Sequence, residues 1–125
     1  MATLRTFIVE DNPVILKNLT VALEELADLQ VVGSAGSEVE AVRGLEKMAG
    51  DVDLVIVDVF LASGSGLGVL RYAQGAQLAA PRVVLTNYAT SDMRKRCLEL
   101  GADRVFDKSK DLDELFDYCE KLADV

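Results

Sequence analysis

Histidine is absent from this 125-residue chain, and long apolar runs are absent as well. Without an imidazole the chain has no histidine for acid–base catalysis and no imidazole ligand for a metal. No run approaches the roughly 20 apolar residues that a membrane-spanning helix needs, and the amino terminus carries no secretory signal pattern. We therefore expect a cytoplasmic chain that contacts no membrane.

Cysteines and basic residues are few. Cys97 and Cys119 stand among apolar neighbours in segments of helical pattern, and neither has a partner at a recognised metal or redox spacing. We expect both to be reduced and packed as small hydrophobic side chains. The 13 Lys and Arg residues against 21 Asp and Glu give a net charge of −8, which argues against direct nucleic-acid binding.

The composition that remains is typical of a globular domain, with half of the residues hydrophobic and 27% charged. This length is sufficient for one sizeable core, and no linker, repeat or low-complexity segment interrupts it. We expect a single domain over residues 1–125 with no effector domain.

Short apolar runs alternate along the chain with segments of helical periodicity. This order predicts an α/β fold of the (βα)₅ type, in which helices cover both faces of a parallel sheet. Asn12, Ser37 and Ser91 are the predicted caps of the first, second and fourth helices. The predicted strands cover residues 7–9, 31–35, 54–58, 82–86 and 104–106, and the last helix is predicted over residues 111–123, with Leu112 facing inward.

Polar residues stand where four of these predicted strands end. Glu10 and Asp11 follow the first strand, and Asp58 ends the third. Thr86 ends the fourth, and Lys108 comes just after the fifth. Because parallel strands end at one edge of the sheet, we expect these side chains at the edge where open α/β sheets place their active sites. Three carboxylates there would repel one another, and Mg²⁺ would relieve the repulsion.

This group of side chains predicts a metal-assisted phosphate site. A cation held by the carboxylates would neutralise phosphoryl oxygens and align them with a carboxylate nucleophile. The Lys108 ammonium would bind another phosphoryl oxygen, and the Thr86 hydroxyl would donate to a third. Each residue also has a plain alternative: an acidic pair favours a helix dipole, a threonine can simply end a strand, and a lysine can be solvated surface.

The order of elements and site residues resembles the receiver domain of bacterial two-component response regulators over the whole chain. The resemblance implies a flavodoxin-like, doubly wound, five-stranded parallel sheet with strand order 2-1-3-4-5. It implies that Asp58 accepts a phosphoryl group from a phosphohistidine of a sensor histidine kinase or a histidine phosphotransfer protein. Glu10, Asp11 and Asp58 would bind Mg²⁺ as the cofactor, with the backbone carbonyl of Phe60 as a further ligand.

The same resemblance implies a switch. Thr86 and Lys108 would bind and sense the phosphoryl group, and Phe106 would turn inward. The face made by the fourth helix, fifth strand and fifth helix would then change, and this face would signal to an unknown output protein. The implied function is phosphorelay signal transduction by a stand-alone domain rather than enzymatic turnover, with at most intrinsic phosphotransfer and autodephosphorylation.

Three positions depart from the family pattern. Ala62 and Ser109 stand where the family often has proline, and Asn87 stands where it often has a smaller residue. Because glycine and serine dominate residues 63–66, the loop after Asp58 is predicted to be more mobile than usual.

Other functions stay open at this stage. A degenerate receiver would act as a phosphorylation-independent interaction module. A haloacid-dehalogenase-type phosphatase also uses an Asp at a strand end with Mg²⁺, but it carries a second Asp where this chain has Phe60. A dinucleotide- or flavin-binding module would need a glycine-rich turn after the first strand, where this chain has Glu10 and Asp11.

The last two predicted helices carry opposite charges. Such charged faces are common on solvated helices. The sharper expectation is a symmetric homodimer, in which the basic fourth helix of one copy meets the acidic fifth helix of the other. The basic residues are Arg94, Lys95 and Arg96, and the acidic ones are Asp111, Asp113, Glu114, Asp117 and Glu120.

Overall fold

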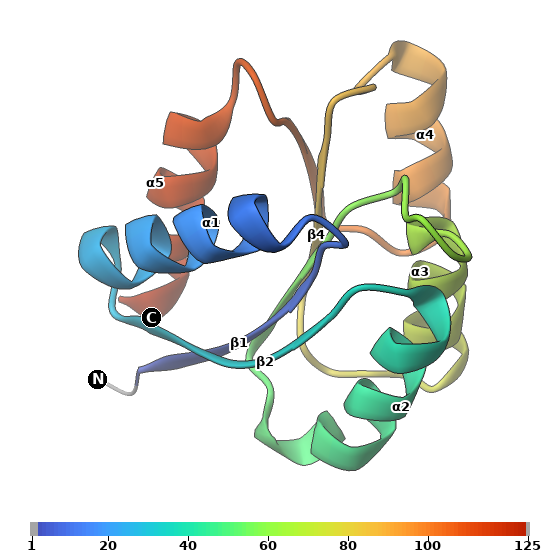
Figure 1. Cartoon of the computed structure of the whole chain (residues 1–125), viewed down its shortest axis with the longest axis horizontal. Helices are drawn as coiled ribbons and strands as arrows, with labels where there is room; N and C mark the ends of the chain where they lie inside the picture. The colour runs from blue at the N-terminus through green and yellow to red at the C-terminus, as the bar shows by residue number, and fades with distance from the viewer. Residues whose placement is uncertain (1–2, 125) are drawn as a thin grey trace.

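Five parallel strands lie side by side at the centre of the molecule in the order β2-β1-β3-β4-β5 (Figure 1). The computed structural model describes residues 3–124. Both the predicted fold class and the predicted strand order are confirmed. The strands are β1 (Leu4–Val9), β2 (Leu29–Ala35), β3 (Leu54–Val57), β4 (Arg82–Thr86) and β5 (Arg104–Asp107).

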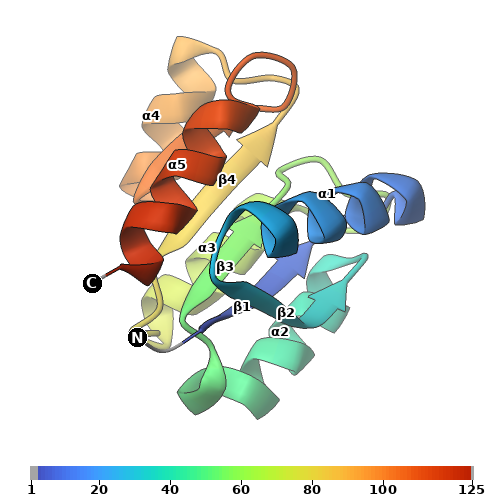
Figure 2. The same ribbon diagram turned by 90° about the vertical axis from the view of Figure 1, so that its left-hand side faces the viewer.

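A helix follows each strand and runs back toward the end of the sheet at which the strands begin. Figure 2 shows α1 and α5 together on one face of the sheet, and α2, α3 and α4 lie on the other. Within residues 3–124 no helix combines the length and apolar character that crossing a membrane requires. The helices are α1 (Pro13–Leu26), α2 (Glu38–Met48), α3 (Gly66–Gly75), α4 (Ser91–Glu99) and α5 (Leu112–Ala123), with a short 3₁₀ turn over Ala49–Asp51.

Side-chain caps set where the helices begin. The Asn12 side chain accepts hydrogen bonds from the backbone of the first turn of α1, and Ser37 caps α2 in the same way, both as predicted. The prediction of Ser91 as the cap of α4 is wrong by one residue. Thr90 has the extended backbone of a cap, and its hydroxyl accepts from the Met93 N–H at 3.2 Å, so Ser91 is the first helical residue.

The core lies on both faces of the sheet, and β5 shows how alternating side chains divide between them. Val105 packs in the layer covered by α2, α3 and α4, which also buries Cys97. Phe106 points the other way, into the layer of α1 and α5, which also buries Cys119. Both cysteines are free and buried, as predicted.

Candidate functional site

Three carboxylates meet where β1 and β3 end. Val9 pairs with Val57 in the two adjacent strands, so the residues that follow them are brought together. The Asp58 N–H also donates to the Val9 carbonyl at 3.0 Å. One carboxylate oxygen each from Glu10, Asp11 and Asp58 lies within 4.8 Å of the others. Glu10 is only 5% exposed and Asp58 only 7%, so this charge is largely withdrawn from water.

Lys108 supplies the positive charge that this buried pair requires. Its Nζ donates to Glu10 Oε1 at 2.6 Å and to Asp58 Oδ2 at 2.8 Å, and its side chain is 12% exposed. Burial by itself would lower the pKa of Lys108. The hydrogen bonds and charges of Asp58 and Glu10 outweigh burial and raise the pKa above its ordinary value of 10.5. The ammonium is therefore charged at neutral pH.

Backbone N–H groups bind one oxygen of each carboxylate. Glu10 Oε2 accepts from the Asn12 N–H at 3.0 Å, and Asp58 Oδ1 accepts from the Phe60 N–H at 3.2 Å. Asp11 Oδ2 accepts from the Ala62 N–H at 2.7 Å. A proline at position 62 could not donate this bond, so the departure from the family pattern gives Asp11 a partner. The loop that was predicted to be mobile is thus tied to the site by its backbone.

Thr86 is not among the residues that line the cleft around Asp58. It is fully buried at the end of β4, and its hydroxyl accepts from the Tyr88 N–H at 3.2 Å. The Thr86 carbonyl accepts from the Lys108 N–H at 2.9 Å, which links the ends of β4 and β5.

Two exposed aromatic rings line the cleft around Asp58. The rings of Phe60 and Tyr88 meet edge to face with their centroids 4.8 Å apart. They come from two different loops, and sequence spacing alone could not show that they touch. The cleft has a volume of about 200 Å³ and is lined by Glu10, Asp11, Ile15, Asp58, Phe60, Asn87, Tyr88 and Lys108.

Phe106, the predicted switch residue, lies in the core. Its ring is 1% exposed and lies 6.0 Å from the ring of Tyr118, on the α1 and α5 face of the sheet. The guanidinium of Arg104 covers it at 5.4 Å. The ring thus lies inward and forms part of the core here, and its role as a switch stays a prediction. The residue of β5 that faces the α4 layer is Val105.

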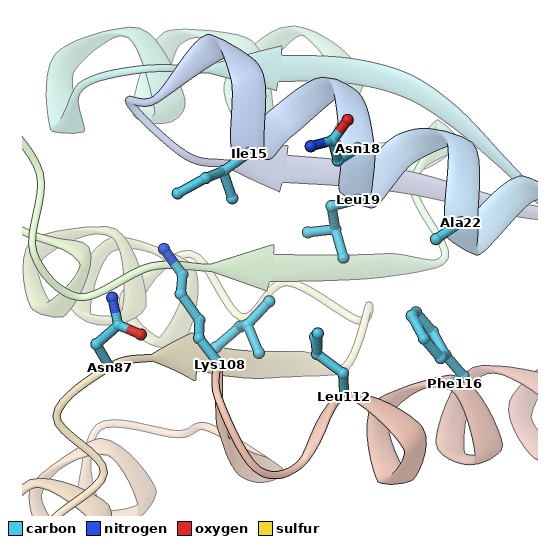
Figure 3. A pocket seen from close by; sticks show the side chains of 9 residues that line it. Ile15, Asn18, Leu19, Ala22, Asn87, Lys108, Leu112 and Phe116 are labelled. Carbon is cyan, nitrogen blue, oxygen red and sulfur yellow. The ribbon is translucent and has the colours of Figure 1, made fainter.

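An apolar groove between α1 and α5 opens from the same end of the sheet (Figure 3). Figure 3 shows Lys108 and Asn87 at one end of it and Phe116 at the other. Its volume is about 420 Å³. The groove and the cleft around Asp58 share three lining residues, Ile15, Asn87 and Lys108. Leu112, predicted to face inward, is 37% exposed on the groove wall, because α5 does not close over α1 at its first turn.

The three carboxylates fit a hard divalent cation. Glu10, Asp11 and Asp58 offer oxygen ligands at the mutual spacing that a shared ion requires, and oxygen is the donor that Mg²⁺ prefers. Lys108 neutralises only one of the three negative charges, so the cluster attracts a further cation. Mg²⁺ bound there would neutralise charge on phosphoryl oxygens.

Comparison with known proteins identifies the family. The family model described as the response regulator receiver domain matches residues 6–120. An uncharacterized transcriptional regulatory protein of Bacillus subtilis, YvfU, is 29% identical over 96% of this chain and 59% of its own length. A protein-glutamate methylesterase/protein-glutamine glutaminase of Myxococcus xanthus is 31% identical over 86% of this chain. The chain spans only 31% of the length of that enzyme.

Solved structures agree with this result. A two-component response regulator of the LuxR family from Aurantimonas has a TM-score of 0.88 with this chain at 25% identity. The likeness covers 98% of this chain and 86% of that one. The phosphatase, the cofactor module and the degenerate receiver are not favoured. The family match covers most of the chain, and the three predicted carboxylates converge, so this chain belongs to the receiver-domain family of two-component response regulators.

Proposed function

We propose that this receiver acts in the cytoplasm and takes a phosphoryl group onto Asp58 from a partner's phosphohistidine. The observation that supports this most is the set of charges around the Asp58 carboxylate. The Lys108 Nζ lies 2.8 Å from it. The carboxylates of Glu10 and Asp11 lie close enough to bind the same metal ion as Asp58. The donor would be a sensor histidine kinase or a histidine phosphotransfer protein, because these 125 residues contain no histidine that could carry the group.

The transfer is a displacement at phosphorus. An Asp58 carboxylate oxygen forms the new O–P bond while the N–P bond of the phosphohistidine breaks, and the imidazole nitrogen leaves with the bonding electrons. Glu10, Asp11 and Asp58, with the backbone carbonyl of Phe60, would hold Mg²⁺. Lys108 then exchanges one carboxylate contact for a phosphoryl oxygen and stabilises its charge.

Thr86 would report the event to the rest of the domain. Its hydroxyl, which accepts from the Tyr88 N–H, would donate its hydrogen to a phosphoryl oxygen, which draws the β4–α4 loop toward Asp58. That loop is joined to β5 through Arg94, which donates to the carbonyls of Ala89 at 3.0 Å and Val105 at 2.9 Å. A shift of Thr86 is thereby passed to α4 and β5, the face that would contact an output protein.

The first prediction concerns the acceptor. Incubation with a small phosphodonor and Mg²⁺ is expected to add one phosphoryl group to the wild-type chain, as read by intact mass. Asp58→Ala should gain none, because the nucleophile is gone, whereas the exposed carboxylate variant Asp117→Ala should be phosphorylated like the wild type. An unmodified wild type would contradict the proposal and favour a phosphorylation-independent module. An undiminished adduct in Asp58→Ala would contradict Asp58 as the acceptor.

The face made by α4, β5 and α5 carries charges of both signs, which would allow two copies of the chain to form a homodimer through it. Arg94 is engaged within its own chain, 3.3 Å from Asp111. Lys95 and Arg96 remain exposed on α4, opposite in sign to the exposed acidic residues of α5. A twofold axis would pair each basic helix with the acidic helix of the other copy.

The second prediction tests this dimer. Sedimentation velocity with Mg²⁺ and beryllofluoride, a phosphoryl mimic, is expected to show a dimer where the untreated chain is a monomer. The charge reversal Lys95→Glu should return the treated protein to the monomer. A monomeric wild type in both states would contradict the dimer without affecting the acceptor chemistry.

A further inference from the structure

Glu38 joins α2 to the loop that follows the acceptor Asp58. It is the first residue of α2, and its backbone N–H donates to the Ser63 carbonyl at 3.2 Å. Its carboxylate oxygen Oε1 accepts from the Ser65 N–H at 2.9 Å. Two hydrogen bonds from one residue thus cross to a loop that is distant in the sequence. In the sequence, Glu38 cannot be told apart from an ordinary acidic residue in the first turn of a helix.

Two glycines form the slot into which the Glu38 side chain fits. Gly64 has φ +78, and a Cβ there would lie 2.4 Å from the Cβ of Glu38. At Gly68, on the first turn of α3, a Cβ would lie 2.3 Å from Glu38 Oε2. A side chain at either position would displace the carboxylate. The loop and the helix therefore have the shape that this side chain needs.

Hydrogen bonds hold the loop that follows Asp58 at several points. At its far end the Gly66 N–H donates to the Val59 carbonyl at 2.8 Å. In its middle the Ala62 N–H donates to Asp11 at 2.7 Å. The segment that contains Phe60 is thus held on one side by the acidic cluster and on the other by Glu38. Removing the Glu38 carboxylate would take away the acceptor of the Ser65 N–H, while the bond from Ala62 to Asp11 and the two backbone bonds would remain.

We propose that Glu38 is a positioning residue for the metal and phosphoryl site. Its carboxylate holds the loop in the conformation that presents the Phe60 backbone and the Ala62 N–H to Asp58 and Asp11. This inference rests on the proposed function, since the site it supports is the Mg²⁺ site of the acceptor. Glu38 does not contact the ion or the phosphoryl group itself, and it acts through the Ser65 N–H.

The third prediction is a change in Mg²⁺ affinity, measured by titration calorimetry on the full chain. Glu38→Ala is expected to weaken Mg²⁺ binding about tenfold, the usual cost of losing a group that orients metal ligands. Glu38→Gln keeps an acceptor oxygen for the Ser65 N–H and should stay close to the wild type. Glu40→Ala removes an exposed carboxylate of the same helical turn and should leave the affinity unchanged.

Gly68→Ala provides a second test that does not alter Glu38. In the wild-type background the new methyl group displaces the carboxylate, so Mg²⁺ affinity should fall as it does in Glu38→Ala. In the Glu38→Ala background the slot is empty, and the same substitution should have little further effect, which is the non-additivity expected of two residues in contact. Hydrogen exchange of the Ser65 amide, measured without Mg²⁺, should accelerate in both single variants.

The outcomes separate this inference from the proposed function. A wild type that binds no Mg²⁺ would overturn both. A wild type that binds Mg²⁺ while Glu38→Ala matches Glu40→Ala in affinity would overturn the positioning role alone. The same holds if Glu38→Ala lowers the unfolding temperature without changing Mg²⁺ affinity or Ser65 exchange, because Glu38 would then serve only the stability of α2.

Discussion

Lys108→Met is expected to lower the free energy of unfolding by about 3–5 kcal/mol in the absence of Mg²⁺, the usual cost of removing one partner of a buried ion pair. The variant keeps most of the apolar stem but loses the ammonium 2.6 Å from Glu10 and 2.8 Å from Asp58. Both carboxylates are nearly buried. They would then face each other and Asp11 with no cation between them.

Urea unfolding with and without Mg²⁺ measures this effect. Mg²⁺ should stabilise Lys108→Met more than the wild type, because the ion supplies the charge that the variant lacks. Lys110→Met is the matched control, since Lys110 is exposed and its loss should change stability little. Equal losses in the two variants would contradict a structural role for the Lys108 ammonium.

The pH dependence of the Lys108 contribution follows from the direction of its pKa shift. The pKa is raised above 10.5 in the folded chain, so the ammonium binds its proton more tightly there than in the unfolded chain. Its contribution to stability is therefore fully present below that ordinary value and is lost as pH rises through the folded value. Between neutral pH and 10.5 the lysine itself should add no pH dependence to the difference between wild type and Lys108→Met.

Gly66→Ala is expected to cost about 3 kcal/mol of stability, at the upper end of the usual range for overpacking. A Cβ at this position would lie 2.1 Å from the Asp58 carbonyl oxygen and 2.8 Å from the Val59 Cα. Both are backbone atoms, so no side chain can turn away to make room. The end of β3 would have to move, and the Asp58 carboxylate would move with it.

Gly75→Ala in the same helix is the control for this substitution. Nothing lies within 4 Å of a Cβ at Gly75, so the change should be neutral or stabilise α3 by up to about 1 kcal/mol. Thermal or urea unfolding separates the two variants, and phosphodonor labelling should show a loss of acceptor activity only in Gly66→Ala. Similar unfolding free energies for the two variants would show that the loop accommodates a side chain at position 66.

Local patterns along the chain were sufficient for the order of strands and helices and for the meeting of the carboxylates. The run that ends at Asp58 is apolar along its whole length, which predicts a strand buried on both faces. Asp58 is the first polar residue after it and therefore lies at the end of the strand. Glu10 and Asp11 follow a neighbouring strand of the same direction. Once the sheet is parallel, these residues meet at its carboxyl edge whatever the details of packing.

The cap of α4 shows how local patterns can still miss by one residue. Thr90 and Ser91 are neighbours with equivalent hydroxyls, so both suit a cap. Only the path of the chain leaving β4 decides which of the two has an extended backbone. Tertiary structure made that choice in favour of Thr90.

Contacts between distant segments belong to the tertiary structure alone. Phe106 packs under Arg104 and beside Tyr118, because the pleat of β5 turns position 106 toward α5 rather than α4. Arg94 is engaged by Asp111 within one chain, which a count of charges along the helices does not reveal. Glu38 reaches the acceptor loop only because α2 and α3 lie side by side on one face of the sheet. Periodicity gives the face on which a residue stands, while its partner depends on how the elements pack.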